Sequence, residues 1–392
     1  MAVNLTNADS ALKTYYLDAV SEQLNNNANP FLAQIKKTTD DVWGKEVRKL
    51  AIHGLNGGIG AGSEDGDLPP AKGNHYSQFT ATLKNLYGTI EISDKAIRAS
   101  ENNSGAFVSL LNAEMDGLIK ASSFNLGRML FGNGTGVLGK VSSISNGIVV
   151  LSTVQNVMEG MIVDFRTSAG VLIEGATGRE IEVVDRISKA VKLSGTTLTT
   201  ETVPANSIMT VQGSYNNEIT GLSAIFDNNV PTLYGLTKSE NYWMNPYIKA
   251  SVGSISESAI QKALDNIEEN GGAPANLIVT SMGVRRSLVN LLSSNKRNID
   301  AMDLAGGFRA ISYNGIPVVA DRFCPSGTMY LLNTEDFALH QLCDWEWLSG
   351  DDGKVLRQVA GKPVYTATLV KYAELVCSRP YGQGALFGIT EA

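Results

Sequence analysis

The stretch Gly54–Asn74, GLNGGIGAGSEDGDLPPAKGN, decides the fold of this chain. It contains seven glycines and two prolines, and it separates two runs typical of β-strands, Lys45–Ile52 and Tyr76–Ser93. Two strands joined by such a loop form a protruding ribbon. An isolated two-stranded ribbon is only marginally stable in water, and a long loop without structure of its own is usually functional. The sequence therefore predicts a ribbon that lies on a neighbouring subunit, in a chain that assembles. The candidate intersubunit contacts of the ribbon are Leu55, Ile59, Leu68, Lys72 and Tyr76.

The composition is that of a globular protein. Hydrophobic residues make up 43% of the 392 residues and charged residues 18%, which is typical of folded chains and leaves room for two or three domains. Acidic residues outnumber basic ones by 39 to 32, and the formal net charge is -7. Tight binding of nucleic acid needs clustered cations, so this charge argues against it. A wall that only encloses nucleic acid has the opposite requirement, because a basic inner face would hold the nucleic acid fast.

The cysteines and the N-terminal sequence indicate where the protein is made. Cys324, Cys343 and Cys377 are scattered and have no metal-binding spacing, which indicates reduced thiols in a reducing compartment. The segment Met1–Tyr16 lacks the basic and apolar parts of a secretory signal. No stretch of about 18 apolar residues predicts a membrane span. The sequence therefore predicts synthesis in the cytoplasm.

Two helices and a β-rich insert are predicted before the last third of the chain. Residues 8–24 have the apolar spacing of an amphipathic helix. Ser104–Phe131 predicts a second helix, roughly 40 Å long at 1.5 Å per residue. From residue 140 to residue 213 the chain is rich in Val, Ile, Thr and Gly, with turn residues about every ten positions, which is typical of a small β-barrel or sandwich. Because this stretch lies between a helix and α/β sequence, it is expected to be an inserted domain.

The last third of the chain has the pattern of an α/β domain. Ser254 and Glu257 have the spacing of a capping box at the start of a helix. The expected C-cap of that helix is Asn270–Gly271. The other expected elements are a helix over about Gly283–Leu292 and strands at Leu277–Thr280, Ile316–Ala320, Met329–Leu332 and Val364–Val376.

Three motifs that could indicate ligand or metal binding are better explained by structural roles. Gly134–Gly139 matches G-x-G-x-x-G, but it follows a helix and precedes β-sequence, the reverse of the order that dinucleotide binding requires. His53 and His75 flank the glycine-rich loop and can face each other, yet no third ligand has a metal-binding spacing. Tyr242–Tyr247 could form a carbohydrate platform, but its Met and Pro favour a packed corner. No catalytic motif is found, and the sequence predicts no catalytic, cofactor or metal site.

The order of these parts resembles the major capsid protein of tailed double-stranded-DNA bacteriophages, whose shell fold is shared with encapsulins and the herpesvirus capsid floor. The matching parts are an N-terminal arm, an extended ribbon or E-loop, a spine helix, and an apical α/β domain that closes on a long peripheral strand. The resemblance covers nearly the whole chain except residues 140–213. The segments that support it are Leu233–Trp243, Asn276–Ser281, Tyr313–Asp321, Pro325–Leu332, Tyr365–Leu375 and Gly384–Ile389.

The resemblance implies an α+β fold of the elongated phage-capsid type. It consists of an N-arm, an extended β-ribbon, a long spine helix, peripheral β-strands and an apical α/β domain, to which this sequence adds a small β-barrel-like domain. The expected boundaries are 1–41 for the N-terminal arm with its helix, 42–95 for the ribbon, 96–139 for the spine helix and peripheral domain, 140–213 for the inserted β-domain, 214–255 for a connection, 256–350 for the apical α/β domain and 351–392 for the closing strand.

The implied function is that of a major capsid protein, which self-assembles into the icosahedral head shell around packaged double-stranded DNA. The implied partners are further copies of the chain in hexamers and pentamers, a portal, and a separate scaffolding protein, because no long charged helical segment precedes the arm. The DNA is enclosed without sequence-specific binding, a decoration protein is left open, and the expected location is the capsid of the virion. Three alternatives stay open: a phage tail or surface protein whose β-insert recognises a ligand, an encapsulin-like cargo shell, and, most distantly, an enzyme.

Some members of the resembled family join the ribbon to the peripheral domain by an isopeptide bond between a Lys and an Asn, assisted by a buried Glu. Lys72 is placed to be the donor, and the reaction needs an uncharged amine. However, no Asn follows Asn333, and the closing strand from Val355 to Val376 lacks one. Lys72 is therefore expected to be a solvated loop charge or half of an intersubunit ion pair, in a shell held only by non-covalent contacts.

Overall fold

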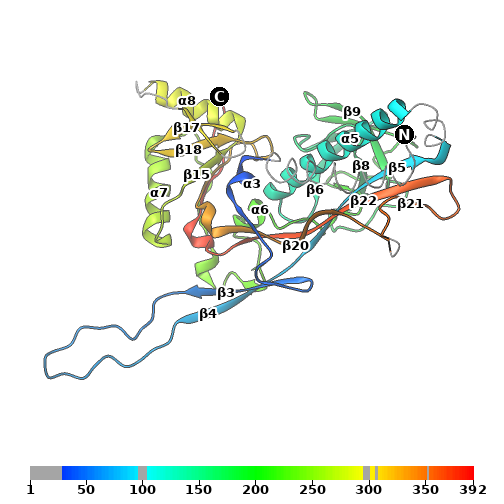
Figure 1. Cartoon of the computed structure of the whole chain (residues 1–392). Helices are drawn as coiled ribbons and strands as arrows, with labels where there is room; N and C mark the ends of the chain where they lie inside the picture. The colour runs from blue at the N-terminus through cyan, green and yellow to red at the C-terminus, as the bar shows by residue number, and fades with distance from the viewer. Residues whose placement is uncertain (1–28, 96–103, 295–300, 305–307, 351–352) are drawn as a thin grey trace.

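The computed structural model describes residues 29–95, 104–294, 301–304, 308–350 and 353–392. The molecule is elongated, and a ribbon with a long loop projects from a body that contains two sheets and a barrel (Figure 1). The helix predicted for residues 8–24 lies outside the described residues. None of the helices described here is long and apolar enough to cross a membrane.

The ribbon is a three-stranded antiparallel sheet made of β2 (Val42–Trp43), β3 (Glu46–His53) and β4 (His75–Thr82). β3 and β4 pair along their full length, and the glycine-rich loop continues outward from the end of that pair (Figure 1). The run Tyr76–Ser93, expected as a single strand, is two strands. β4 ends at Thr82, and the next strand belongs to a different sheet. The reason is that the two halves of the run have different partners, β3 for the first and the closing strand for the second.

A five-stranded sheet lies beside the ribbon. Its strands are β1 (Lys36–Thr38), β20 (Phe337–Trp347), β22 (Val364–Cys377), β21 (Arg357–Gln358) and β5 (Lys84–Ser93). The long helix α5 (Ser104–Phe131) lies against this sheet and has the predicted bounds. Gly88 of β5 allows the close approach, because a Cβ atom there would lie 2.7 Å from Leu118 Cδ1 and 3.1 Å from Ser122 Oγ. Met115, Leu118 and Leu126 of α5 are buried, as the apolar spacing of the helix requires.

The predicted β-rich insert is a closed barrel of six strands, in the order β10-β7-β6-β11-β8-β9. The strands are β6 (Val137–Ser145), β7 (Ile148–Leu151), β8 (Ile162–Arg166), β9 (Arg179–Asp185), β10 (Ala190–Leu193) and β11 (Ile208–Val211). The barrel begins at Val137, before the expected residue 140, because β6 already pairs with β11 there. Its buried side chains form a separate hydrophobic cluster that includes Val149, Phe165 and Met209. The chain enters and leaves the barrel side by side, since the Asn216 N–H donates to the Thr135 carbonyl at 3.1 Å.

The second sheet of the body has seven strands, in the order β14-β23-β19-β15-β18-β17-β16. The strands are β14 (Tyr247–Lys249), β15 (Leu277–Thr280), β16 (Ala301–Asp303), β17 (Arg309–Tyr313), β18 (Ile316–Ala320), β19 (Met329–Leu332) and β23 (Gly384–Leu386). The helices α7 (Glu257–Gly271) and α8 (Met282–Ser294) pack on this sheet. The short remaining elements are α3 (Pro30–Gln34), α6 (Leu222–Ile225), β12 (Thr232–Leu233), β13 (Leu236–Thr237) and the 3₁₀ turns η2 (Tyr242–Met244), η4 (Thr334–Asp336) and η5 (Pro380–Gly382).

Both predicted caps of α7 are wrong by one or two residues. The N-cap is Ser256, whose Oγ accepts the Ala259 N–H at 3.2 Å, and not Ser254. At the other end the helix continues through Gly271, and the residue in the left-handed conformation is Gly272, with φ of 70°. Gly271 stays helical and serves packing, because a Cβ atom there would lie 2.6 Å from Gly382 Cα.

Candidate assembly surfaces

The ribbon has one face buried against the body and one apolar face that is open. Val47, Ala51 and Phe79 are buried beneath the sheet. The alternate positions point outward, since successive side chains of a strand lie on opposite faces. Four large side chains are more than half exposed on the outer side, and they are called the ribbon face below: Trp43, Leu50, Ile52 and Tyr76. The register pairs Ile52 with Tyr76 and Trp43 with Glu46, which places these side chains on the same side.

Of the five residues predicted to make ribbon contacts, only Tyr76 belongs to the ribbon face. Leu55, Ile59, Leu68 and Lys72 are exposed along the loop beyond the sheet. Trp43, Leu50 and Ile52 were missed by the sequence reasoning. The run Glu46–His53, EVRKLAIH, could have indicated them, because it has apolar residues on both faces of a strand.

An aromatic stack holds the paired strands of the ribbon on the body. The rings of His53 and Trp243 lie 4.6 Å apart, and those of Phe79 and Trp243 lie 5.7 Å apart. Within the segment Tyr242–Tyr247, Trp243 and Met244 are packed as the expected corner requires, while Tyr242 is exposed. His53 and His75 do face each other, with ring centroids 5.8 Å apart. His53 Nε2 also lies 3.0 Å from the Ser77 hydroxyl. In the described part of the chain, no group of three or more His, Cys, Asp or Glu side chains could hold a metal ion.

The two halves of the glycine-rich loop lie close together. A Cβ atom on Gly58 would be 3.2 Å from the backbone nitrogen of Lys72, and one on Gly60 would be 3.2 Å from Pro69 Cγ. The loop reverses at a turn in which the Gly66 N–H donates to the Ser63 carbonyl at 3.1 Å. The loop is thus a narrow extension of the ribbon, and the residues between Ser63 and Gly66 form its tip.

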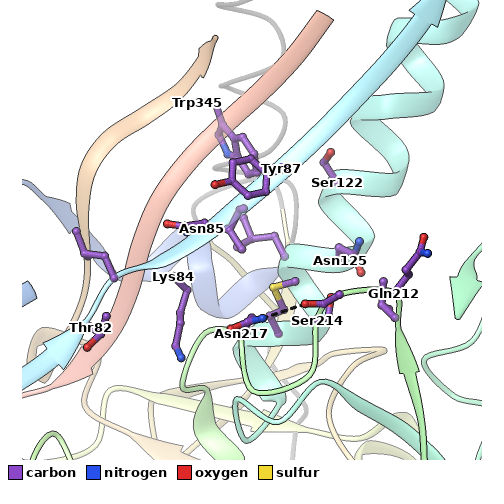
Figure 2. Close-up of a pocket in the computed structure, with 16 residues that line it drawn as sticks. Thr82, Lys84, Asn85, Tyr87, Ser122, Asn125, Gln212, Ser214, Asn217 and Trp345 are labelled. Atoms are coloured by element: carbon purple, nitrogen blue, oxygen red, sulfur yellow. Dashed lines mark hydrogen bonds between the residues drawn. The ribbon is translucent and has the colours of Figure 1, made fainter. Parts of the chain in front are cut away.

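A cavity of about 560 Å³ lies where β5, α5 and the chain leaving the barrel meet (Figure 2). Its polar lining includes Ser122 and Asn125 of α5 and Gln212 after the barrel. The one charged side chain among its lining residues is Lys84, whose Nζ donates to the Asn216 carbonyl at 3.1 Å. The lining therefore offers no pair of groups suited to acid–base chemistry.

Buried titratable side chains hold the parts of the body together near this cavity. Arg128 of α5 donates two hydrogen bonds to Glu218 after the barrel, at 2.8 and 2.6 Å, and both side chains are buried. Glu374 of β22 accepts the N–H groups of Thr220 at 2.7 Å and Leu375 at 3.1 Å. Burial raises the pKa of Glu374 to about 8, because desolvation penalises the charged form. These contacts tie α5 and the closing strand to the segment that follows the barrel.

A further buried cation lies on the closing strand. Lys371 donates to Gln341 Oε1 and to Asp344 Oδ1, both at 2.6 Å, and its ammonium lies 5.6 Å from the centre of the Trp345 ring. Burial lowers the pKa of Lys371, and the Asp344 carboxylate opposes that shift. The arrangement satisfies a buried charge between β20 and β22, which is a structural role.

No protein-family model matches the chain, and no curated protein matches it in sequence. Among solved structures, the chain is similar to the capsid of cyanophage A-1(L), with a TM-score of 0.58 over 93% of this chain and 94% of that chain, at 13% sequence identity. The chain has the fold of a phage capsid protein. The capsid fold expected from the order of the sequence segments is thereby confirmed.

Other solved structures are similar to the chain with lower TM-scores. The SrpI encapsulin of Synechococcus elongatus PCC 7942 has a TM-score of 0.47 and 10% identity, over 95% of each chain. A chain of Mycobacterium phage Bobi has a TM-score of 0.46 and 9% identity, over 94% of this chain and 92% of that chain. At these identities the likeness is one of backbone arrangement.

Proposed function

We propose that this chain is the major capsid protein of a tailed double-stranded-DNA bacteriophage, and that its copies assemble into the icosahedral head shell around the packaged genome. The observation that carries the proposal is the open ribbon face on a capsid fold. Trp43 is 68% exposed, and Leu50 and Ile52 are each 60% exposed, on a sheet that projects from the body. Exposed apolar patches of this kind mark interaction surfaces.

The driving force for assembly in this proposal is burial of the ribbon face against a second copy. Complete burial of a large apolar side chain stabilises by roughly 1.5–3 kcal/mol. The four side chains are already partly covered, so the gross gain is on the order of 4–8 kcal/mol per ribbon before the cost of association. Such contacts are individually weak, and a closed shell is stable because each subunit makes several of them.

The proposed partners follow from the same assignment. Copies of the chain form hexamers and pentamers, a separate scaffolding protein and a portal take part in assembly, and the mature protein is located in the virion. The net charge of -7 fits a wall that encloses DNA without binding its sequence. The barrel has its own core, which makes it a candidate platform for a decoration protein.

Expression of the chain, followed by sizing chromatography and negative-stain microscopy, tests the proposal. A capsid protein gives capsomers, shells or tubular polyheads, alone or with a scaffolding protein. Discrete monomers or trimers under all conditions would contradict it. The contents of particles purified from their natural source distinguish a phage head from an encapsulin-like shell. A phage head contains double-stranded DNA, and an encapsulin-like shell contains protein cargo.

A further inference from the structure

We propose that the outer edge of strand β5 is a docking site for an extended segment of a separate polypeptide. The segment adds to the five-stranded sheet as a further strand and carries Lys or Arg at one end. The outer edge is defined as the main-chain N–H and C=O groups of Asn85, Tyr87, Thr89 and Glu91 of β5. This inference goes beyond the proposed function and does not depend on it, because the whole site belongs to one chain.

One edge of β5 is paired and the other is open. Among the described strands, β5 pairs with β22 alone. In the register of that pair, the Asp94 N–H donates to the Pro363 carbonyl at 2.9 Å. Hydrogen-bonded residues alternate along an antiparallel pair, so the even-numbered residues of β5 bond to β22 and the odd-numbered ones point their main-chain groups outward. The Leu348 N–H confirms this alternation. It donates at 2.8 Å to the carbonyl of Thr368, the partner of Thr89, which therefore points away from β5.

The open edge is long enough to pair with another strand. The outward groups have no hydrogen-bond partner within the part of the chain that the structure describes. From Asn85 to Glu91 they span roughly 20 Å, at about 3.3 Å per residue. Two common protections of an edge strand are a bulge and a proline, and β5 has neither. Such an edge binds extended peptides through main-chain hydrogen bonds.

The open edge borders the cavity of about 560 Å³ between β5, α5 and the chain leaving the barrel. Asn85 and Tyr87 line it from β5, and Ser122 and Asn125 line it from α5 (Figure 2). Successive side chains of an added strand lie on opposite faces, so every second one enters this cavity, where amides and hydroxyls offer hydrogen bonds.

The cavity also contains an unused donor. Trp345 lines it, and its buried indole N–H has no hydrogen-bond partner among the described residues. A buried donor without a partner is costly, and an oxygen brought by the occupant removes that cost. The space beside the open edge therefore has the polar groups that a peptide requires.

The edge is acidic toward the end of β5. Gly88 approaches Leu118 of α5, and the start of β5 lies beside the later turns of α5 in the cavity lining. The strand and the helix therefore run in opposite directions. Glu114 lies one turn before Leu118 on the same side of the helix, which brings it to the level of Glu91. Both carboxylates are exposed, and neither forms an ion pair among the described residues.

This charge selects the occupant. The cations that flank the edge in sequence, Lys84 and Lys95, lie at the start of β5 and beyond its last residue. A segment with Lys or Arg beside Glu91 and Glu114 is therefore favoured. Residues 1–28 of this chain have three carboxylates and one lysine, and residues 54–71 have three carboxylates and no Lys or Arg. Neither has a basic excess, so the occupant is a separate polypeptide.

A synthetic probe tests the edge by fluorescence anisotropy on the unassembled full chain. The probe is an acetylated peptide with a dye at its C-terminus, and it begins with Lys-Thr-Lys and continues with alternate Val and Thr. Its lysines lie beside the carboxylates when it pairs antiparallel to β5. Two further versions carry N-methyl groups on the even or on the odd residues. Only one of these sets faces β5, so that version should bind at least roughly tenfold more weakly, and the other should bind like the unmodified probe.

A charge exchange tests the orientation. The variant with Glu91→Lys and Glu114→Lys should lose on the order of tenfold in affinity for the lysine probe and gain affinity for a probe with Glu in place of Lys. The control variant reverses two exposed carboxylates on α7, Glu268→Lys and Glu269→Lys, and should bind both probes as wild type does.

Four results would overturn the inference. They are no binding of the lysine probe, an equal effect of the two methylation patterns, no response to the charge exchange, and binding to the unassembled chain but not to assembled particles. The last result would assign the edge to a contact between copies. A chain that forms shells but binds no probe leaves the proposed function standing, and a chain that binds the probe but never assembles has the opposite meaning.

Discussion

Replacing Glu374 by Gln should remove a pH dependence from the stability of the subunit. In the folded chain this carboxyl is fully buried, and burial raises its pKa from 4.5 to about 8. The folded state therefore keeps the group neutral up to about pH 8, whereas the unfolded chain ionises above about 4.5. The stability that the neutral carboxyl contributes is fully present below pH 4.5 and is lost as the pH rises from 4.5 to 8. Gln keeps an oxygen that can accept the Thr220 N–H, and it does not ionise.

The size of the effect follows from the pKa shift. One pKa unit corresponds to about 1.4 kcal/mol, so the full window represents on the order of 5 kcal/mol. The substitution also replaces one carboxyl oxygen by an NH₂ group, and each hydrogen bond lost in this way costs about 1–3 kcal/mol at every pH. The absolute stability of the variant is therefore a poor test. The difference between variant and wild type should instead move in favour of the variant by several kcal/mol between pH 5 and pH 8.

Urea unfolding of the two full-length chains, kept unassembled at low protein concentration, measures that difference at pH 5, 6, 7 and 8. Burial also raises the pKa of Asp321 to about 6 and lowers the pKa of His340. Both groups are present in both proteins, so their contributions cancel in the comparison. Parallel stability curves for wild type and Glu374→Gln would show that Glu374 is ionised in the folded state, and the assigned burial would be wrong.

Three further predictions concern the ribbon, the barrel and covalent bonds. Replacing residues 56–72 with a two-residue turn should leave a soluble subunit that melts cooperatively but makes no shells in electron micrographs; normal particles would show that the loop carries no essential contact. Deleting residues 137–213 and joining the flanks with a short Gly-Ser linker should preserve the melting transition of the remainder, because the barrel has its own core and its two ends are adjacent; an insoluble remainder would mean a shared core. Particles boiled in SDS should give a single band near 41.8 kDa, since Lys72 is exposed and no Asn follows Asn333; a ladder that survives reducing agent would contradict non-covalent assembly.

Elements with a long periodic pattern could be predicted from the sequence. The helix Ser104–Phe131 was found with its bounds, because its apolar spacing is sustained and a Gly-Asn-Gly stop follows it. The barrel was found because short alternating runs and turn residues repeat over the whole insert. Cap positions were less accurate. Two serines precede Glu257, and the choice between them depends on the backbone conformation at Ser256, while Gly271 stays helical because Gly382 approaches it in the folded chain.

The candidate site was predicted only in part, for a physical reason. The run Glu46–His53 has apolar residues on both faces, and the sequence does not reveal which face is covered by the chain itself. Trp243, on another segment, decides this by packing against His53 and Phe79 of the inner face. The buried contact between α5 and the segment after the barrel was not predicted, because its partners are distant in sequence. Arg128 and Glu218 are 90 residues apart. Such pairs follow from the tertiary structure and leave no local pattern.

Leu83, at which the run Tyr76–Ser93 divides into two strands, connects the ribbon to the body. Leu83 alone separates β4 from β5, its side chain is buried, and its N–H donates to the Lys45 carbonyl at 2.9 Å. β5 then pairs with β22 without a register shift from Lys84 to Ser93. Because both sides of Leu83 are held by strand pairing, β4 continues into β5 of the five-stranded sheet without a loop that could act as a hinge. The orientation of the ribbon and that of the five-stranded sheet are therefore set together.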